Sequence, residues 1–383
     1  MLRKRIVSII LIIALSFISM VAYGEIDIAA KSALLMDYNS GEIIYAINEH
    51  EKLAPASITK IMTLLITMEL LDEGKINIDD NVSISEHASK MIGTKVYLDA
   101  GETQSVDNLI KAISVRSAND AAVALSEHIA GSEDAFAKLM NQKSKELGMV
   151  NTNFVNASGL PGENHYSTAY DIAIMSRELL KHNKIHEYLS VYMEDLTVGK
   201  TKTSIQTMVN TNRLIKEYDG ANGIKTGYTN EAKHCISASA KRGDLQLIAI
   251  VMGAEDSKLR FNEAKKLLDY GFANYDSVTM GKKGDIIGTI PIEKGRESKL
   301  EIILERDSCI LLPKGKKANI EKKMTHSDYL NAPIAMGNVV GELIILVDGK
   351  EVDKINLVAK TSIDKAKLGE TLKKTWKSFI LNR

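Results

Sequence analysis

Hydrophobic and polar positions divide the 383-residue chain into stretches of different texture. Beyond an apolar leader, β-type runs at 32–37 and 43–47 flank the turn-forming sequence Tyr38-Asn39-Ser40-Gly41, which predicts a hairpin. Apolar residues at helical spacing follow from Ser57 to Glu73, and Gly74 is a suitable residue to end that helix. The same spacing predicts further helices over Val106–Ser114, Asp120–Ala130, Ser132–Leu147 and Thr168–Lys181.

From about Ile224 the pattern changes to strands. Ala232–Ala240 and Leu245–Met252 are predicted to pair around the turn 241–244, and a helix is predicted from about Ser257 to Tyr275. Short β-type runs then alternate with Gly, Pro and Lys, at Asp285–Ile292, Leu300–Leu304, Ile310–Leu312, Val339–Val347 and Lys354–Val358. We therefore expect an α+β fold, with a helix-and-sheet domain over 25–275 and a small all-β domain over 276–360.

The first 24 residues have the features of a signal peptide. Arg3, Lys4 and Arg5 precede an apolar run over 6–21, and Ala22-Tyr23-Gly24 places small residues where signal peptidase cleaves. The alternative is an uncleaved transmembrane anchor, but the run is short for a span of about 20 residues. Cleavage after Gly24 and export are therefore predicted.

The last segment, 361–383, is predicted to be an amphipathic helix. One face carries Leu368, Leu372, Trp376 and Phe379, and lysines dominate the other. Such a helix either packs on its own domain or lies in a membrane interface. Its terminal position and cationic bias favour the membrane. The predicted location is the outer face of the cytoplasmic membrane, with a secreted form as the alternative.

Composition narrows the partner classes. The formal net charge is zero and aromatic residues make up 5% of the chain, so neither overall charge nor aromatic content favours binding to nucleic acid. Cys235 and Cys309 are the only cysteines, and two distant cysteines do not make a disulfide framework. We expect both to be unpaired, structural thiols.

Ser57-Ile58-Thr59-Lys60 lies at the start of the first predicted helix. Residues three apart share a helical face, so Lys60 can reach the Ser57 hydroxyl. A serine hydroxyl needs an adjacent base to become nucleophilic, and lysine can serve if burial or nearby positive charge lowers its pKa. Alone, the pattern also fits a capping serine followed by a solvated lysine.

Two later motifs carry further candidate chemistry. Ser117-Ala118-Asn119, between two predicted helices, presents a hydroxyl and an amide, although either residue can simply cap a helix. Lys225-Thr226-Gly227 opens the strand region: the lysine and hydroxyl suit a carboxylate, and the glycine permits close approach of a ligand backbone. The alternative there is an edge-strand lysine before a turn.

In this order, the three motifs match the set S-x-x-K, S-D-N and K-T-G of β-lactamases and penicillin-binding proteins, with Ala118 in place of Asp. The chain from about Ala30 to its C-terminus resembles the D-alanyl-D-alanine carboxypeptidases, the low-molecular-weight penicillin-binding proteins. The likeness also includes 55–63, 117–122, Phe154-Val155-Asn156, Gly159-Leu160-Pro161, 165–171 and 223–229, while Asn222 stands where the family often has Asp.

The resemblance implies a catalytic domain of the β-lactamase type and a role for each motif residue. Ser57 would attack the D-Ala-D-Ala carbonyl of a peptidoglycan stem peptide, and Lys60 would accept its proton. Ser117 would relay a proton and Asn119 would hold the peptide group. Lys225, Thr226 and Gly227 would form the carboxylate site, and the N–H groups of Ser57 and Tyr228 the oxyanion hole. β-Lactams would be covalent inhibitors, and no cofactor or metal is implied.

Other candidate sites are weaker. His182 and His186 lack the glutamate of a zinc-protease motif and a third ligand, and Glu163 lies in a polar loop rather than a β-lactamase deacylation motif. Two alternative functions remain: a β-lactamase and a non-catalytic wall-binding protein. The Ser117-Ala118-Asn119 motif, the β-domain and the cationic tail disfavour the first. The intact Ser57, Lys60, Ser117 and Lys225 disfavour the second.

Overall fold

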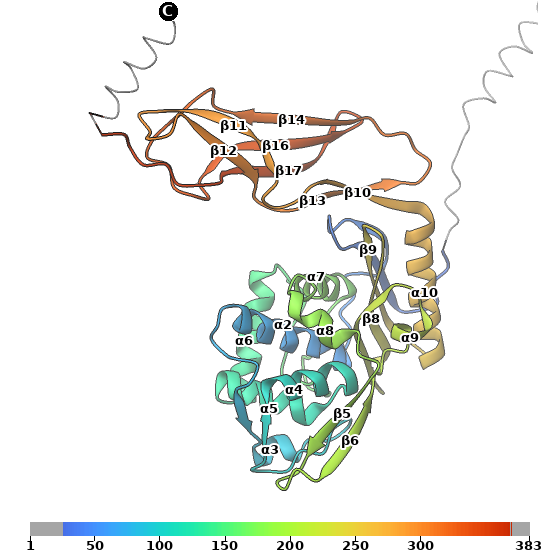
Figure 1. The fold of residues 1–383 in the computed structure, drawn as a ribbon. Coiled ribbons are helices and arrows are strands. Elements are labelled where there is room, and N and C mark those ends of the chain that lie inside the picture. The colour runs from blue at the N-terminus through green and yellow to red at the C-terminus, as the bar shows by residue number, and fades with distance from the viewer. Residues whose placement is uncertain (1–25, 368, 370–383) are drawn as a thin grey trace, which may run out of the picture.

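The computed structural model describes residues 26–367 and 369, which form two domains (Figure 1). The first domain is built on an antiparallel sheet of five strands in the order β2-β1-β9-β8-β7. These strands are β1 (Ser32–Asp37), β2 (Ile43–Ile47), β7 (Ala221–Thr229), β8 (Lys233–Arg242) and β9 (Leu245–Ala254). The predicted hairpin over 32–47 and the predicted pairing of 232–240 with 245–252 are both confirmed.

Helices cover both faces of this sheet. They are α2 (Lys60–Asp72), α3 (Glu86–Ser89), α4 (Val106–Lys111), α5 (Asn119–Ala130), α6 (Glu133–Glu146), α7 (Ala169–Leu179), α8 (His186–Leu189), α9 (Leu214–Glu217) and α10 (Ser257–Asn274). Two 3₁₀ turns, η1 (Ala56–Thr59) and η3 (Asn183–Ile185), and one π-helical turn, η2 (Ala112–Arg116), complete the set. All five long helices expected within 57–181 are present.

Two of these helices differ from their predictions. The helix expected from Ser57 begins as the 3₁₀ turn η1 and becomes α-helical only at Lys60. The segment expected as a helix over Val106–Ser114 leaves the α-helical conformation after Lys111 and continues as η2. The turn is wide because the Ser117 N–H bonds back five residues to the Ala112 carbonyl, and the Ala118 N–H reaches the same oxygen at 3.1 Å. Such turns often occur at functional sites, and this one delivers the chain directly to Ser117.

Both faces of β9 are buried, and this explains its nearly continuous apolar sequence, in which Gln246 is the one polar side chain. Ile248 and Ile250 contact the large helical cluster on one face. Leu247 and Val251 contact α10 and its surroundings on the other face. Alternate side chains of a strand point to opposite faces. A strand that is covered on both sides therefore lacks the apolar–polar alternation of a half-exposed strand.

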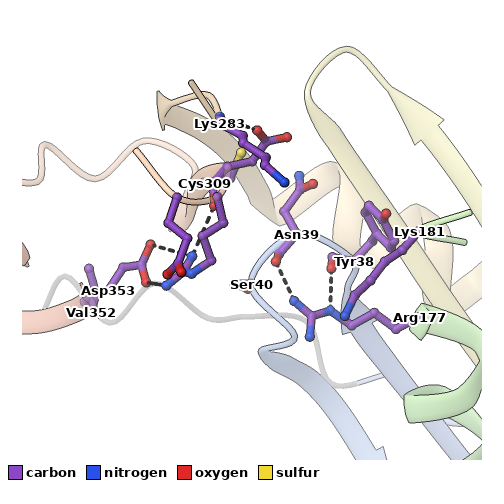
Figure 2. A pocket seen from close by; sticks show the side chains of 12 residues that line it. Tyr38, Asn39, Ser40, Arg177, Lys181, Lys283, Cys309, Val352 and Asp353 are labelled. Carbon is purple, nitrogen blue, oxygen red and sulfur yellow. Dashed lines mark hydrogen bonds and ion pairs between the residues drawn. The ribbon is translucent and has the colours of Figure 1, made fainter. Parts of the chain in front are cut away.

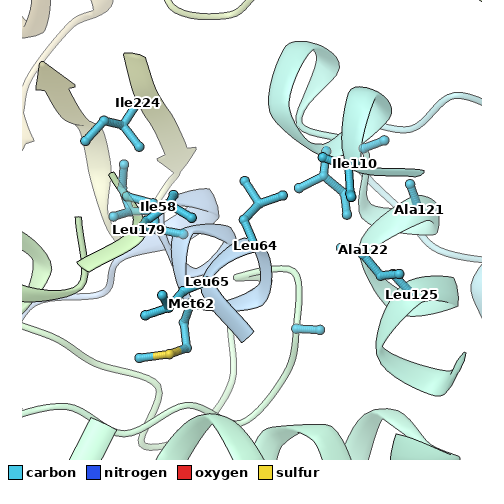
Figure 3. Packing of buried hydrophobic residues seen from close by; sticks show 14 of the residues in the cluster. Ile58, Met62, Leu64, Leu65, Ile110, Ala121, Ala122, Leu125, Leu179 and Ile224 are labelled. Atoms are coloured by element: carbon cyan, nitrogen blue, oxygen red, sulfur yellow. The ribbon is translucent and has the colours of Figure 1, made fainter. Parts of the chain in front are cut away.

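Helix α2 runs through the middle of the helical cluster (Figure 3). All residues from Lys60 to Met68 are buried, including Leu64 and Leu65. Lys60 is 0% exposed at the first position of this helix. A buried amine is unfavourable unless its hydrogen-bonding groups are satisfied, so the surrounding fold has to supply partners for Lys60.

Several short strands were not predicted from the pattern. They are β3 (Asn81–Ser83), β4 (Thr103–Ser105), β5 (Met193–Val198), β6 (Ser204–Val209), β10 (Tyr275–Gly281), β14 (Ile320–His326) and β15 (Leu330–Asn331). In the β5–β6 hairpin only Leu196, Val198 and Met208 are buried. A strand that buries so few side chains shows little hydrophobic alternation, which is the signal that sequence analysis relies on.

The second domain is entirely β-structured, as expected. Six strands form a sheet in the order β14-β16-β17-β12-β11-β15, and β10 pairs with β13. The remaining bounds are β11 (Ile286–Glu293), β12 (Lys299–Leu304), β13 (Ser308–Pro313), β16 (Val339–Val347) and β17 (Lys350–Ala359). A separate apolar core includes Ile302, Leu304, Ile345 and Leu357.

The prediction of a C-terminal helix over 361–383 is wrong for residues 361–367. These residues are not helical: Ile363 is 2% exposed and exchanges two backbone hydrogen bonds with Ile334, at 2.8 and 2.9 Å. This stretch packs on the β-domain because Ile363 fills an apolar cluster with Ile292 and Leu300. Leu368, Leu372, Trp376 and Phe379 lie outside the described residues, as does the leader over 1–24. Within 26–367, none of the helices combines the length and apolar character needed to cross a bilayer.

A cleft of about 760 Å³ separates the two domains (Figure 2). On one wall, Arg177 donates to the Tyr38 and Asn39 carbonyls, both at 2.6 Å. On the other wall, Arg306 pairs with Asp353 at 2.5 Å. Cys309 also lines the cleft, and like the buried Cys235 it is unpaired.

Candidate active site

Ser57 and Lys60 meet at the junction of η1 and α2. The Lys60 amine lies 3.0 Å from the Ser57 hydroxyl, as their spacing predicts. Ser57 is partly exposed, whereas Lys60 lies beneath it in the core. Ala56, just before the serine, has φ +48°, in the left-handed region that non-glycine residues rarely occupy. The local backbone thus presents the hydroxyl outward, above a buried amine.

Two further groups contact the Lys60 amine. It donates to the Asn119 Oδ1 atom at 2.7 Å and to the Ser158 carbonyl at 2.5 Å. Burial, reinforced by the nearby charge of Lys225, lowers the pKa of Lys60 well below its ordinary value, against an opposing effect of Asp120 and Glu133. These are the conditions under which lysine can act as a base.

The structure brings Asn119 into this cluster and places Ser117 beside it in the chain. The Asn119 side chain also donates to the Ile92 carbonyl at 2.7 Å. Ser117 has φ +67° and is buried at the C-terminal end of η2. Among the described residues, no hydrogen bond joins its hydroxyl to Ser57 or Lys60. Asn119 is therefore held by contacts at both ends of its amide, while the Ser117 hydroxyl has no such link to the pair.

Lys225 and Thr226 lie within β7, which begins at Ala221 rather than at Lys225 as the sequence suggested. The Lys225 side chain is 1% exposed, and its amine has no hydrogen-bond partner among the described residues. Burial, with a smaller effect of Arg260, lowers the pKa of Lys225 to about 7. The Thr226 hydroxyl donates to the Thr211 hydroxyl at 2.8 Å. A buried, unpaired amine of this kind is a ready anion site.

Gly227 allows the edge strand to pass close to Ser57. A methyl group at Gly227 would lie 3.1 Å from both the Ser57 nitrogen and the Pro55 carbonyl oxygen. The next residue, Tyr228, is 54% exposed and stacks on His234 with 4.4 Å between ring centres. The backbones of Ser57 and Tyr228 therefore lie on adjacent segments, as an oxyanion hole would require.

Several residues around the site were not predicted as functional. Ser158 supplies the carbonyl that accepts from Lys60, and Gly159 follows it with φ +83°. A Cβ at Gly159 would lie 1.9 Å from the Ala56 carbonyl oxygen, so this loop can pass the nucleophile only with glycine there. Arg260 on α10 donates to the Gly227 carbonyl at 3.0 Å and is buried. A charged residue on the apolar face of a predicted helix is the signal that could have identified Arg260.

The site opens into a pocket of about 460 Å³. Ser57, Asn119 and Ser158 contribute to it, and Tyr228 and Thr229 line it from β7. The other lining residues, not singled out from the sequence except for the Gly159-Leu160 pair, are Gly93, Thr94, Lys95, Tyr97, Arg116, Gly159, Leu160 and Thr211. No carboxylate is among them.

His165 connects the loop after α6 to the turn η1, which carries Ser57. Its Nδ1 atom accepts the Val155 N–H at 3.1 Å, and its Nε2 atom lies 2.8 Å from the Thr59 hydroxyl oxygen. The first contact requires an unprotonated Nδ1. Burial lowers the pKa of His165 to about 4, consistent with this neutral ring.

This histidine predicts a loss of stability in mild acid. Between pH 6.5, the ordinary pKa of histidine, and about 4, the unfolded chain binds a proton that the folded chain excludes. The free energy of unfolding should therefore fall by about 3 kcal/mol from this group, at roughly 1.4 kcal/mol per pKa unit. His165→Gln should lack this contribution, which urea unfolding of both proteins at pH 6.5 and pH 4 measures. Parallel acid losses in the two proteins would contradict the prediction.

The other sequence candidates lie in ordinary surroundings. The His182 Nδ1 atom is 2.6 Å from an Asp72 carboxylate oxygen, and the His186 Nε2 atom is 2.9 Å from the Leu180 carbonyl. Glu163 is exposed in its loop. Across the described ranges, no three side chains of the metal-binding types gather at one point.

Comparisons with known proteins agree with this geometry. Residues 19–256 match the family model described as D-alanyl-D-alanine carboxypeptidase, and residues 275–365 match the model of the penicillin-binding protein 5 C-terminal domain. D-alanyl-D-alanine carboxypeptidase DacF of Bacillus subtilis is 42% identical over 93% of this chain and 92% of its own length.

Solved structures give the same result. Penicillin-binding protein 5 of Haemophilus influenzae matches with 33% identity and a TM-score of 0.73, covering 89% of this chain and 99% of its own. Penicillin-binding protein D2 of Listeria monocytogenes, solved in its ampicillin-bound form, matches with 31% identity and a TM-score of 0.58. It covers 65% of this chain and 99% of its own.

Proposed function

The chain belongs to the D-alanyl-D-alanine carboxypeptidase family, and from this premise we propose that it removes the terminal D-alanine of peptidoglycan stem peptides through a covalent intermediate on Ser57. The observation that carries the proposal is the buried Lys60 amine 3.0 Å beneath a partly exposed serine hydroxyl. Nucleophile and base in contact are the signature of covalent catalysis.

The partners of Lys60 support its assignment as the base. A neutral amine has two N–H groups and one lone pair. The Asn119 Oδ1 atom and the Ser158 carbonyl are acceptors at 2.7 and 2.5 Å, and they take the two N–H groups. The lone pair is then left for the Ser57 hydroxyl. Proton transfer to Lys60 accompanies attack of the serine oxygen on the scissile carbonyl carbon.

The amine of Lys225 supports binding of the substrate's terminal carboxylate. It is buried without a partner, and a carboxylate would supply the missing acceptor and restore its full charge. Thr226 would add a hydroxyl donor. The N–H groups of Ser57 and Tyr228 would stabilise the oxyanion, and Asn119 would hold the peptide group with its remaining N–H.

The reaction would proceed in two stages. The tetrahedral intermediate collapses with breakage of the peptide bond, and Ser117 relays the proton held by Lys60 to the departing D-alanine nitrogen. Water then attacks the Ser57 ester with proton transfer to Lys60, and Lys60 returns that proton to the Ser57 oxygen as the ester bond breaks and the shortened peptide leaves. A β-lactam presents a comparable carbonyl and carboxylate, so we propose that these antibiotics acylate Ser57 as well.

Labelled penicillin tests the nucleophile. Wild type should bind it covalently, and Ser57→Ala should show no labelling while retaining the wild-type melting temperature. Release of D-alanine from an N-acetylated D-Ala-D-Ala peptide should be lost in the same variant. A wild-type protein that stays unlabelled contradicts the proposal. Rapid penicillin turnover without D-alanine release would identify a β-lactamase instead.

We also propose that the protein is exported and that its C-terminal segment holds it at the outer face of the cytoplasmic membrane. The basic and apolar residues after Lys367 support a reversible contact with anionic lipid. A chain ending at Lys367 keeps the buried Ile363 and should lose co-sedimentation with anionic vesicles. Peptide hydrolysis should persist. Equal sedimentation of the truncated and full-length mature chains would contradict the anchor.

A further inference from the structure

The rim segment Lys95–Leu98 holds Tyr97 in an unusual backbone conformation. Tyr97 has φ +61°, which is uncommon for an aromatic residue. The N–H groups of both its neighbours, Val96 and Leu98, bond to the buried Asp120 carboxylate at 3.1 Å. These bonds secure the turn. The Tyr97 side chain remains 60% exposed and lines the pocket that contains Ser57. Strain of this kind tends to be kept where a side chain has a function.

The rim is also fixed relative to the reacting groups. The Asn119 N–H bonds to the Thr94 carbonyl at 2.7 Å, directly beside the Lys60 contact of the same residue. Tyr228 and Thr229 line the same pocket from β7. The mouth of the site therefore has two walls, one on the edge strand and one on this rim.

The rim carries uncompensated positive charge. The Lys95 amine lies 5.3 Å from the centre of the Tyr97 ring. Within residues 26–367, neither Lys95 nor Arg116 has an ion-pair partner, and the pocket lining contains no carboxylate. An aromatic face beside an available ammonium group suits a ligand that is aliphatic along its length and anionic at its end.

The contact follows from the course of the bound peptide, and this step rests on the proposed function. With its terminal carboxylate at Lys225 and Thr226, the peptide passes Ser57 and leaves along β7 toward Tyr228. Arg116 lies at the carboxylate end, because Thr211 bonds both the Val115 carbonyl and Thr226. The rim segment Lys95–Leu98 is then the part of the pocket that faces the residue preceding the two D-alanines.

We propose that Lys95 and Tyr97 form a specificity subsite for the residue preceding D-Ala-D-Ala. The subsite selects a side chain with an aliphatic stem, which packs on Tyr97, and a terminal carboxylate, which pairs with Lys95. Substrates whose side chain ends in an ammonium group are disfavoured by the same lysine.

Three N-acetylated peptides X-D-Ala-D-Ala test the subsite, where X is α-aminoadipate, norleucine or lysine, each measured relative to X = alanine in the same enzyme. Wild type should favour α-aminoadipate over lysine by about fivefold in kcat/KM at low salt, the scale of an exposed ion pair. The preference should shrink toward unity in 1 M salt, where charges are screened beyond about 3 Å. Tyr97→Ala should remove the preference for norleucine over alanine.

Variants of Lys95 separate charge from position. Lys95→Glu should reverse the order of α-aminoadipate and lysine, and Lys95→Gln should make them equal. Lys52→Glu is the matched control, because Lys52 also lies over a tyrosine ring, that of Tyr166 at 4.6 Å, but does not line the pocket. It should leave the ratio at its wild-type value.

The outcomes separate this subsite from the function on which it rests. Hydrolysis of the alanine peptide with equal relative rates for α-aminoadipate and lysine overturns the subsite and leaves the carboxypeptidase intact. Failure to hydrolyse all four peptides overturns the proposed function, and the subsite with it. If Lys95→Glu does not fold, the salt dependence of wild type and the behaviour of Lys95→Gln decide the question.

Discussion

Lys60→Ala should acylate with labelled penicillin about 10²- to 10⁴-fold more slowly than wild type, the usual contribution of a general base. The reason is that the Ser57 hydroxyl then has no basic atom within reach, since Lys60 is the amine 3.0 Å away. Stopped-flow acylation measures the loss directly. Release of D-alanine should fall by a similar factor, because water needs the same base in the second stage.

Two variants distinguish a base from a structural cation at this position. Lys60→Arg keeps a positive charge but cannot lose a proton at any accessible pH, so its acylation should be as slow as that of Lys60→Ala. Lys60→Met fills much of the same volume and leaves Asn119 Oδ1 and the Ser158 carbonyl without their donor, at a cost of about 1–3 kcal/mol each. Its melting temperature shows how much of any loss is structural. A Lys60→Arg protein that acylates at near wild-type rate would rule out the base.

Gly159→Ala should reduce acylation by about 100-fold or more, the usual effect of displacing a catalytic group by about 1 Å. The added methyl carbon would lie 1.9 Å from the Ala56 carbonyl oxygen, and this oxygen belongs to the backbone just before Ser57. Either the nucleophile turn or the Ser158 carbonyl must move. Both changes disturb the contact between Ser57 and Lys60, and we expect the free energy of unfolding to fall as well.

Gly131→Ala is the matched control for this substitution. Gly131 has φ +81°, against +83° for Gly159, but a Cβ there would meet no atom within 4 Å. It should therefore show only the backbone penalty of a left-handed alanine, about 1–2 kcal/mol, and acylate at the wild-type rate. Comparing the acylation rates of Gly159→Ala and Gly131→Ala separates the effect of the steric clash from the effect of backbone strain. Equal acylation by the two variants would show that the Gly159 contact does not position the site.

Much of the fold was predictable because its signals are local. Helix α2, the hairpin β1–β2 and the strands β8 and β9 all have strong apolar patterns and clear terminating residues. The β5–β6 hairpin was missed because few of its side chains are buried. The prediction of a C-terminal helix was wrong over 361–367, because the burial of Ile363 against Ile292 and Leu300 decides the conformation of that stretch.

Within the site, sequence spacing predicted the contact between Ser57 and Lys60, because the two residues lie on one turn of the chain. The sequence by itself also determined which residue types were available: one nucleophile, two lysines, an amide and the hydroxyls of Ser117 and Thr226, in three short motifs. Only the tertiary structure decided how they work together. Asn119 and the Ser158 carbonyl reach Lys60 from 59 and 98 residues away, and Lys225 is left buried without a partner. Burial and contacts between distant segments set the pKa of both lysines, and no local pattern encodes either.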